Sequence, residues 1–113
     1  RNSIIKAFSD SPFSTPSIKE NVDLYGEEIM NYLQAENLLI FVGNDVAFLS
    51  ENYQEMVNWV IKKIELTGSV TVAEFRDKFQ TSRKYALALL EHLDTKGTTI
   101  RDGDFRKLRP VRK

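Results

Sequence analysis

The sequence lacks several features on which common protein functions depend. It contains no cysteine and a single histidine, His92, so disulfide bonds are excluded and no metal-binding cluster of these residues is expected. It has no run of 18 apolar residues and no charged-then-apolar signal segment, so we expect no membrane association. A glycine-rich phosphate loop, a Rossmann fingerprint and a carboxylate pair suited to catalysis are also missing. The sequence therefore predicts neither an enzyme nor a cofactor-binding chain.

What is present indicates a small folded protein. Its 113 residues are 42% hydrophobic and include seven phenylalanines, four tyrosines and one tryptophan, which is enough for a real core. The length suits one domain or two small units of roughly 55–60 residues, each marginal by itself. Because the chain begins at Arg1 and not at methionine, we expect it to be part of a longer protein.

The formal net charge is zero, but the two halves of the chain differ sharply. Residues 1–52 contain three basic and eight acidic residues, whereas residues 53–113 contain 13 basic and eight acidic residues. Such asymmetry is a hint that one half binds a polyanion. The alternative is that the charged residues only keep two faces of the protein hydrated and bind no polyanion.

The first half predicts a helix followed by a β-hairpin. The helix spans Tyr25–Glu36 and is expected to bury Ile29, Tyr32 and Leu33. The hairpin consists of residues 38–42 and 45–49, with the turn at Gly43-Asn44. A shift of 60 residues without gaps aligns these elements with a second helix and hairpin, so the sequence predicts two copies of one small unit.

The second half begins with a helix over Glu51–Leu66, which joins the two units, and continues with a shorter helix within Val70–Phe79 that Thr71 is expected to begin. The next helix follows Thr81 or Ser82 as N-cap and ends at Gly97. Its buried stripe is predicted at i, i+3, i+4 and i+7, namely at Ala86, Leu89, Leu90 and Leu93. A basic tail with Arg109, Arg112 and Lys113 ends the chain.

The dipeptide Asp102-Gly103 predicts a type I′ turn between residues 98–101 and 104–108. With this turn, Arg101 pairs with Asp104 and Thr99 pairs with Arg106. The two arginines would then point outward, while Ile100 and Phe105 would pack inward on the other face.

A candidate anion site lies at the start of the last helix. Arg83 and Lys84 occupy its first turn, where cations are disfavoured by the helix dipole and backbone N–H groups lack partners. The outward face of this helix, predicted at Leu87, Ala88, Glu91 and His92, is not basic, so we expect end-on contact by the helix start and the hairpin. Tyr85 could stack on an unpaired base, or it could pack under the hairpin.

These residues also carry a family resemblance. The pattern of residues 81–86 (TSRKYA), Leu89-Leu90-Glu91, Leu93-Asp94, Gly97, Thr99, Arg101, Gly103-Asp104 and Arg106 resembles the last winged-helix domain of the bacterial selenocysteine-specific elongation factor SelB. The first half fits the preceding winged helix of that family by architecture only. The resemblance implies a mainly α fold with small β-hairpins: an acidic, N-terminally truncated winged helix at 1–50 and a basic, RNA-binding winged helix at 51–113.

The resemblance implies that the last winged helix binds the selenocysteine insertion (SECIS) hairpin of messenger RNA. It implies a cytoplasmic monomer that reaches the ribosome only indirectly; GTP and magnesium would be bound by a GTPase part absent from this chain. The expected RNA-binding residues are Thr81, Ser82, Arg83, Lys84, Tyr85, Arg101, Gly103, Asp104, Arg106 and Lys107.

Two other functions remain open for a winged helix. A DNA-binding module of a transcription regulator would need a more polar helix face and usually a dimerisation helix. A protein-interaction module would need an exposed apolar patch, and its partner binding would be indifferent to replacing Arg83 or Arg106 by alanine.

Overall fold

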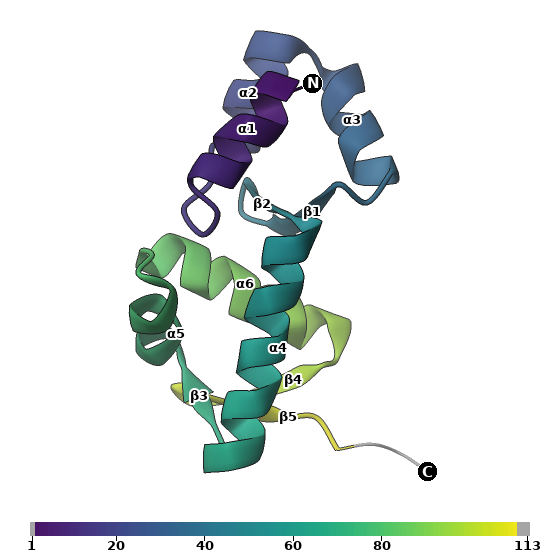
Figure 1. Ribbon diagram of the computed structural model, residues 1–113. Helices are drawn as coiled ribbons and strands as arrows, with labels where there is room; N and C mark the ends of the chain where they lie inside the picture. The colour runs from purple at the N-terminus through teal and green to yellow at the C-terminus, as the bar shows by residue number, and fades with distance from the viewer. Residues whose placement is uncertain (1, 111–113) are drawn as a thin grey trace. The chain divides into compact units, whose positions relative to one another are not determined.

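The computed structural model describes residues 2–110 (Figure 1). Arg112 and Lys113 of the predicted basic tail lie outside the described residues. The chain divides into two compact units, Arg1–Glu55 and Met56–Lys113, and the division falls within the helix α4. The elements of the first unit are α1 (Asn2–Asp10), α2 (Ile18–Tyr25), α3 (Glu27–Ala35), β1 (Leu39–Gly43) and β2 (Val46–Leu49). Those that follow are α4 (Ser50–Thr67), β3 (Val70–Thr71), α5 (Val72–Phe79), α6 (Arg83–Lys96), β4 (Thr99–Asp102) and β5 (Phe105–Leu108).

The first unit packs three helices against a two-stranded hairpin. Its core consists of Ile4, Phe8, Met30, Leu33, Leu39, Ala47 and Leu49. The predicted helix over Tyr25–Glu36 exists, but α3 begins at Glu27, because Gly26 adopts a φ of 95° and separates it from α2. Tyr32, which was expected to be buried, is 43% exposed, and Met30 lies in the core in its place.

The turn of the first hairpin lies one residue later than predicted. Asn44 and Asp45 form it, with φ values of 53° and 61°, and Gly43 pairs with Val46. Both residue types tolerate the left-handed region because their short polar side chains form local hydrogen bonds. Here the Asp45 carboxylate accepts hydrogen bonds from the Ser17 hydroxyl and the Lys19 backbone N–H, which fixes the turn.

The second unit combines α4, α5 and α6 with a three-stranded antiparallel sheet in the order β3-β5-β4. The sequence predicted α4 closely and placed Thr71 correctly as the N-cap of α5, where a capping box with Glu74 forms. It missed β3, because a strand of two residues leaves no periodic pattern. Trp59 meets Phe75 and Phe79 edge-on beneath α5, at centroid distances of 6.0 and 5.6 Å.

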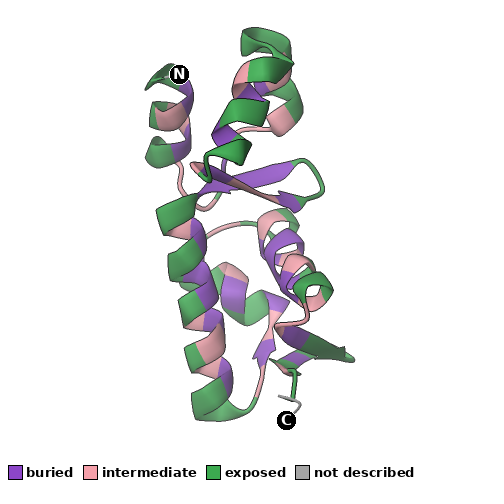
Figure 2. Cartoon of the chain, turned by 90° about the vertical axis from the view of Figure 1, so that its right-hand side faces the viewer, coloured by how far each residue is buried: buried purple, intermediate pink, exposed green. Residues whose placement is uncertain are grey.

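The turn of the second hairpin lies one residue later than predicted, so each residue of the first strand pairs with a residue two positions later than expected. Gly103 and Asp104 form the turn, so Arg101 lies opposite Arg106 and Asp102 opposite Phe105. A shift of two residues keeps each side chain on its face, so Thr99, Arg101 and Arg106 share one face, and Ile100 and Phe105 share the other, as predicted. The prediction was wrong about which face turns inward, since Ile100 and Phe105 are 47% and 49% exposed whereas Arg106 is buried. Figure 2 colours the chain by burial and shows that much of the wing is exposed.

Helices dominate both units, and the sheets are small. Three helices followed by a hairpin whose second strand pairs with a short strand between the first two helices make the second unit a winged helix, with β4 and β5 as its wing.

Candidate nucleic-acid interface

The start of α6 differs from the starts of two other helices. The hydroxyls of Ser17 and Thr71 accept hydrogen bonds from backbone N–H groups of α2 and α5. Ser82 occupies the N-cap position of α6, but its side chain makes no capping hydrogen bond. The first N–H groups of a helix have no intrahelical acceptor, so this end of α6 offers donors to an anion.

Positive side chains surround this helix start. Arg83 and Lys84 are both exposed, and the first turn of α6 contains no acidic residue. The ammonium of Lys84 lies 5.5 Å from the ring centroid of the half-buried Tyr85. Thr81, also half-buried, donates its backbone N–H to the carbonyl of Arg76 at 3.0 Å, which ends α5 just before α6 begins.

A hollow of about 370 Å³ brings the helix start and the wing together. Three arginines from two parts of the chain line it. The lining consists of Thr71, Val72, Ala73, Arg83, Leu87, Arg101, Asp104 and Arg106. The exposed guanidinium groups of Arg83 and Arg101 outnumber the one carboxylate of the lining, Asp104, which leaves a concave surface of positive charge that attracts polyanions.

The tip of the wing is shaped by its turn. Arg101 is exposed and donates its Nε–H to the carbonyl of Gly103 at 2.9 Å. Gly103 has a φ of 61°, and a side-chain carbon placed there would meet nothing within 4 Å. A glycine suits this position because of its backbone angle, and the open space beside it leaves room for a ligand. Asp104 completes the turn and is also exposed.

Arg106 is the main correction to the predicted site. Its side chain points into the unit and the residue is 1% exposed, although it was expected on the outer face. Its Nε lies 3.2 Å from Oδ2 of Asp94 on α6. The hydroxyl of Thr99 donates to Oδ1 of the same carboxylate at 2.6 Å. The physical reason is that the face carrying Thr99 and Arg106 turns toward α6, where the Asp94 carboxylate accepts hydrogen bonds from both.

Lys107 lies on the other face of the wing. It is exposed, and its Nζ is 3.0 Å from Oδ2 of Asp102 across the two strands. This outer face also carries Ile100 and Phe105. Of the ten predicted site residues, four line the hollow, namely Arg83, Arg101, Asp104 and Arg106. Lys107 lies on the other face of the wing, and Thr81, Ser82, Lys84, Tyr85 and Gly103 are not part of the lining.

The outward face predicted for α6 was partly wrong. Ala88 is 3% exposed and belongs to the core, and Leu87 lines the hollow. His92 is half-buried; burial, together with the charge of Lys96, lowers the pKa of its imidazole below the ordinary value. No group of three or more histidine, cysteine, aspartate or glutamate side chains among residues 2–110 could hold a metal ion.

Sequence reasoning missed two contributions to this region. The start of α5 lines the hollow through Thr71, Val72 and Ala73, and only the unpredicted strand β3 brings it beside the wing. The role of Asp94 was also missed. A signal was available, since Asp94 follows the core residue Leu90 by four residues and therefore lies on the same stripe of α6, where a carboxylate needs a polar partner.

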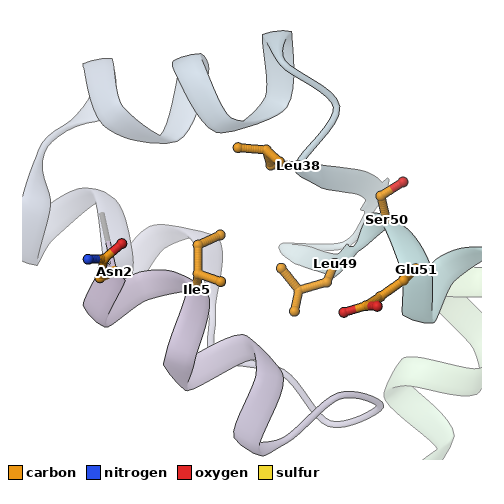
Figure 3. Close-up of a pocket in the computed structure, with 6 residues that line it drawn as sticks. All are labelled: Asn2, Ile5, Leu38, Leu49, Ser50 and Glu51. Carbon is orange, nitrogen blue, oxygen red and sulfur yellow. The ribbon is translucent and has the colours of Figure 1, made fainter.

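The first unit has a hollow of a different kind. It measures about 400 Å³ and is lined by Asn2, Ile5, Leu38, Leu49, Ser50 and Glu51. Figure 3 shows Ile5 on α1 facing Leu38 and Leu49 across it. No basic side chain lines this hollow, so it offers nothing for a polyanion.

No helix among the described residues combines the length and the apolar character needed to cross a bilayer.

Comparisons with known proteins agree with this geometry. Residues 64–108 match the family model described as elongation factor SelB, winged helix. A selenocysteine-specific elongation factor from Desulfomicrobium baculatum is 29% identical over 82 residues, which cover 73% of this chain. The match spans 13% of that relative's length.

Two solved structures share the fold. The mRNA-binding domain of E. coli elongation factor SelB, determined in complex with SECIS RNA, matches with a TM-score of 0.72 and 19% identity. The match covers 93% of this chain and 95% of that one. A bacterial selenocysteine-specific elongation factor, EF-Sec, matches with a TM-score of 0.76 and 20% identity, over 96% of this chain and 18% of that one. Residues 64–108 are thus similar to the winged helix of elongation factor SelB, and nearly the whole chain shares the fold of the two solved structures.

Proposed function

We propose that this chain is the mRNA-binding part of a selenocysteine-specific elongation factor and that its second unit binds a SECIS hairpin. One observation carries the proposal: the uncapped, basic start of α6 and the wing arginine Arg101 line the same hollow. A single curved polyanion could touch both. The E. coli domain with the same fold, over nearly the whole chain, was solved with SECIS RNA.

The phosphates of the hairpin would bind at the helix start and at the wing tip. Arg83, Lys84 and Arg101 supply charge there, and the backbone N–H groups of the first turn supply directional donors. The hydroxyls of Thr81 and Ser82 and the backbone of Gly103 and Asp104 lie beside them. Phosphate contacts position the RNA, while unpaired loop bases supply specificity. Tyr85 is the residue of this set that could stack on such a base.

RNA fits this surface better than duplex DNA. A helix laid along the DNA major groove presents polar side chains along its length. Here Leu87 lies at the hollow, Ala88 is buried, and Glu91 would repel phosphate. Only the end of α6 is suited to contact, and end-on contact matches the wide, shallow surface of a structured RNA.

The rest of the family's activity would lie in other parts of the parent protein. Its GTPase part would bind GTP and magnesium and carry the aminoacylated tRNA to a recoded codon. The chain itself would perform no chemistry. It would act in the cytoplasm as a monomer and reach the ribosome through the message that it holds.

The test is a titration of the chain with three nucleic acids at several salt concentrations. These are the SECIS hairpin, the same stem with its loop base removed, and duplex DNA. If three cations each neutralise one phosphate, log affinity should fall against log salt with a slope of roughly −2 to −3. Removing the loop base should weaken binding clearly. Equal affinity for duplex DNA would favour the DNA-binding alternative.

Two variants connect this binding to the hollow. Arg83→Ala and Arg101→Ala should each reduce affinity by about 1–3 kcal/mol and lower the salt slope by about one unit. Arg76→Ala is the matched control, because Arg76 is a partly exposed arginine of the same unit that pairs with Asp77 and does not line the hollow. An equal loss for all three variants would indicate nonspecific attraction.

A further inference from the structure

Arg106 is buried in a way that stability alone does not explain. Its Nη2 is buried and has no hydrogen-bond partner among the described residues, and its ion pair with Asp94 is made through Nε. A buried ion pair is often no more stabilising than apolar residues of similar volume. A leucine or methionine could fill the same space beneath the wing. An apolar side chain packs without a preferred orientation, whereas the ion pair fixes the orientation of Arg106 relative to Asp94.

The acceptor of this pair sits between two residues of the wing. Asp94 Oδ2 lies 3.2 Å from Arg106 on β5, and Oδ1 accepts a hydrogen bond of 2.6 Å from Thr99 on β4. Both wing residues are 1% exposed, whereas the Asp94 side chain is 24% exposed. One carboxylate on α6 therefore holds both strands of the wing and sets their position relative to the helix.

The residues that the wing presents to the hollow depend on this anchor. Arg101 lies directly opposite Arg106 in the ladder and two residues after Thr99. Its backbone position follows from the two anchored residues, because a four-residue strand is stiff over that distance. Arg83, in contrast, belongs to the first turn of α6 and does not depend on the wing.

We infer that Asp94 and Arg106 are positioning residues, which hold the wing against α6 so that Arg101 and Arg83 face one RNA together. The inference rests on the proposed RNA binding, and it assigns to Arg106 a role through Asp94 in place of direct contact. The inference predicts a change in RNA affinity that is opposite in sign to the usual effect. Loss of an acidic residue ordinarily strengthens binding to a polyanion, but loss of Asp94 should weaken it.

The first experiment compares two carboxylate deletions on the same helix. Asp94→Ala should lower affinity for the SECIS hairpin by roughly fivefold or more, as if one wing contact were lost. Glu91→Ala removes the same charge one helical turn earlier, from an exposed position, and should leave affinity unchanged or raise it. Unchanged or higher affinity for Asp94→Ala would overturn the inference.

A double-mutant cycle separates positioning from a general loss of stability. In the Asp94→Ala background, Arg101→Ala should change affinity by less than about twofold, because the wing contact is already lost. Arg83→Ala should keep its full effect in that background. An Arg101→Ala effect that persists undiminished would contradict the inference. If Asp94→Ala is not folded by circular dichroism, Asp94→Asn takes its place in the cycle.

Hydrogen exchange on the free protein gives a readout that needs no RNA. Asp94→Ala should speed exchange of the amides in β4 and β5 relative to those in α6. Wing amides that exchange as in the unmodified protein would refute the anchoring. If the unmodified chain failed to bind the hairpin, the RNA proposal would fall, and the exchange result would still decide whether Asp94 anchors the wing.

Discussion

The two units contain a hairpin at equivalent points but use it in opposite ways. In the first unit, the strands β1 and β2 contribute Leu39, Ala47 and Leu49 to the core, and every residue of β2 is buried. In the second unit, the wing is mostly exposed, and Arg106 is the buried residue of β5. The comparison teaches that the same order of elements can make either a buried hairpin or an exposed one.

Charge follows the same division. The first unit, residues 1–55, contains three basic and nine acidic residues, and the second contains 13 basic and seven acidic residues. The helix before each hairpin differs at its start, since α3 opens with Glu27 and Glu28 and α6 with Arg83 and Lys84. Acidic residues stabilise a helix N-terminus and basic residues do not. The second unit therefore gives up some helix stability at the helix start where we propose that a phosphate binds.

The largest expected effect tests the difference between the hairpins. Phe48→Ala should lower the free energy of unfolding by about 3–5 kcal/mol, because the ring is 0% exposed and its loss leaves a cavity. Phe105→Ala should lower it by about 1 kcal/mol or less, since half of that ring already meets water. Urea unfolding of both variants measures the contrast. Similar losses would mean that the wing packs as deeply as the first hairpin.

An intermediate effect is expected from exchanging charge at the two helix starts. Arg83→Glu together with Lys84→Glu should lower affinity for the RNA hairpin by about 2–6 kcal/mol, the sum of two contacts. The same variant should raise the melting temperature slightly, because each acidic residue suits the helix dipole by roughly 0.3–1 kcal/mol.

The reciprocal variant, Glu27→Arg with Glu28→Lys, is the control for that exchange. It places the same charges on α3, where no basic hollow or exposed wing supports them. It should not create binding that depends on the loop of the RNA. Loop-dependent binding by this variant would show that charge at a helix start is sufficient by itself.

The smallest effect concerns pH and is confined to the second unit, which contains the one histidine. Burial and then Lys96 lower the pKa of His92 below 6.5, so the unfolded chain binds the proton more readily. The stability that His92 contributes is complete above pH 6.5 and is lost as the pH falls from there through its lowered pKa. Melting temperatures between pH 7.5 and 5.5 should show this small decline, and His92→Gln should remove it. If the melting temperature of the His92→Gln variant still declined, other titratable groups would be the cause.

Periodic features of the sequence predicted the helices well. The stripe of α6 and the N-cap of α5 were placed correctly, because both depend on residues close together in the chain. The turns were each misplaced by one residue, since Gly43-Asn44 and Asp102-Gly103 suit a turn as well as the pairs that form it. Tertiary contacts choose between such registers, as the hydrogen bonds of Asp45 with Ser17 and Lys19 do in the first hairpin.

The candidate site was predicted only in part, because only some of its residues follow from local patterns in the sequence. Arg83, Lys84 and Arg101 follow from local patterns, and the structure places Arg83 and Arg101 on one hollow. The burial of Arg106 could not be predicted, because it depends on which face of a four-residue strand meets α6. The strand β3, which brings the start of α5 to the site, was too short to leave a signal.

The tight turn at Gly103-Asp104 limits how the wing can diverge. An insertion or deletion of one residue within β5 would interchange its two faces, exposing Arg106 and driving the ammonium of Lys107 toward the core. Natural variation in wing length should therefore occur in steps of two residues or by extension of the loop beyond the ladder. Single-residue indels in the strand would remove the anchor and the ligand surface at once.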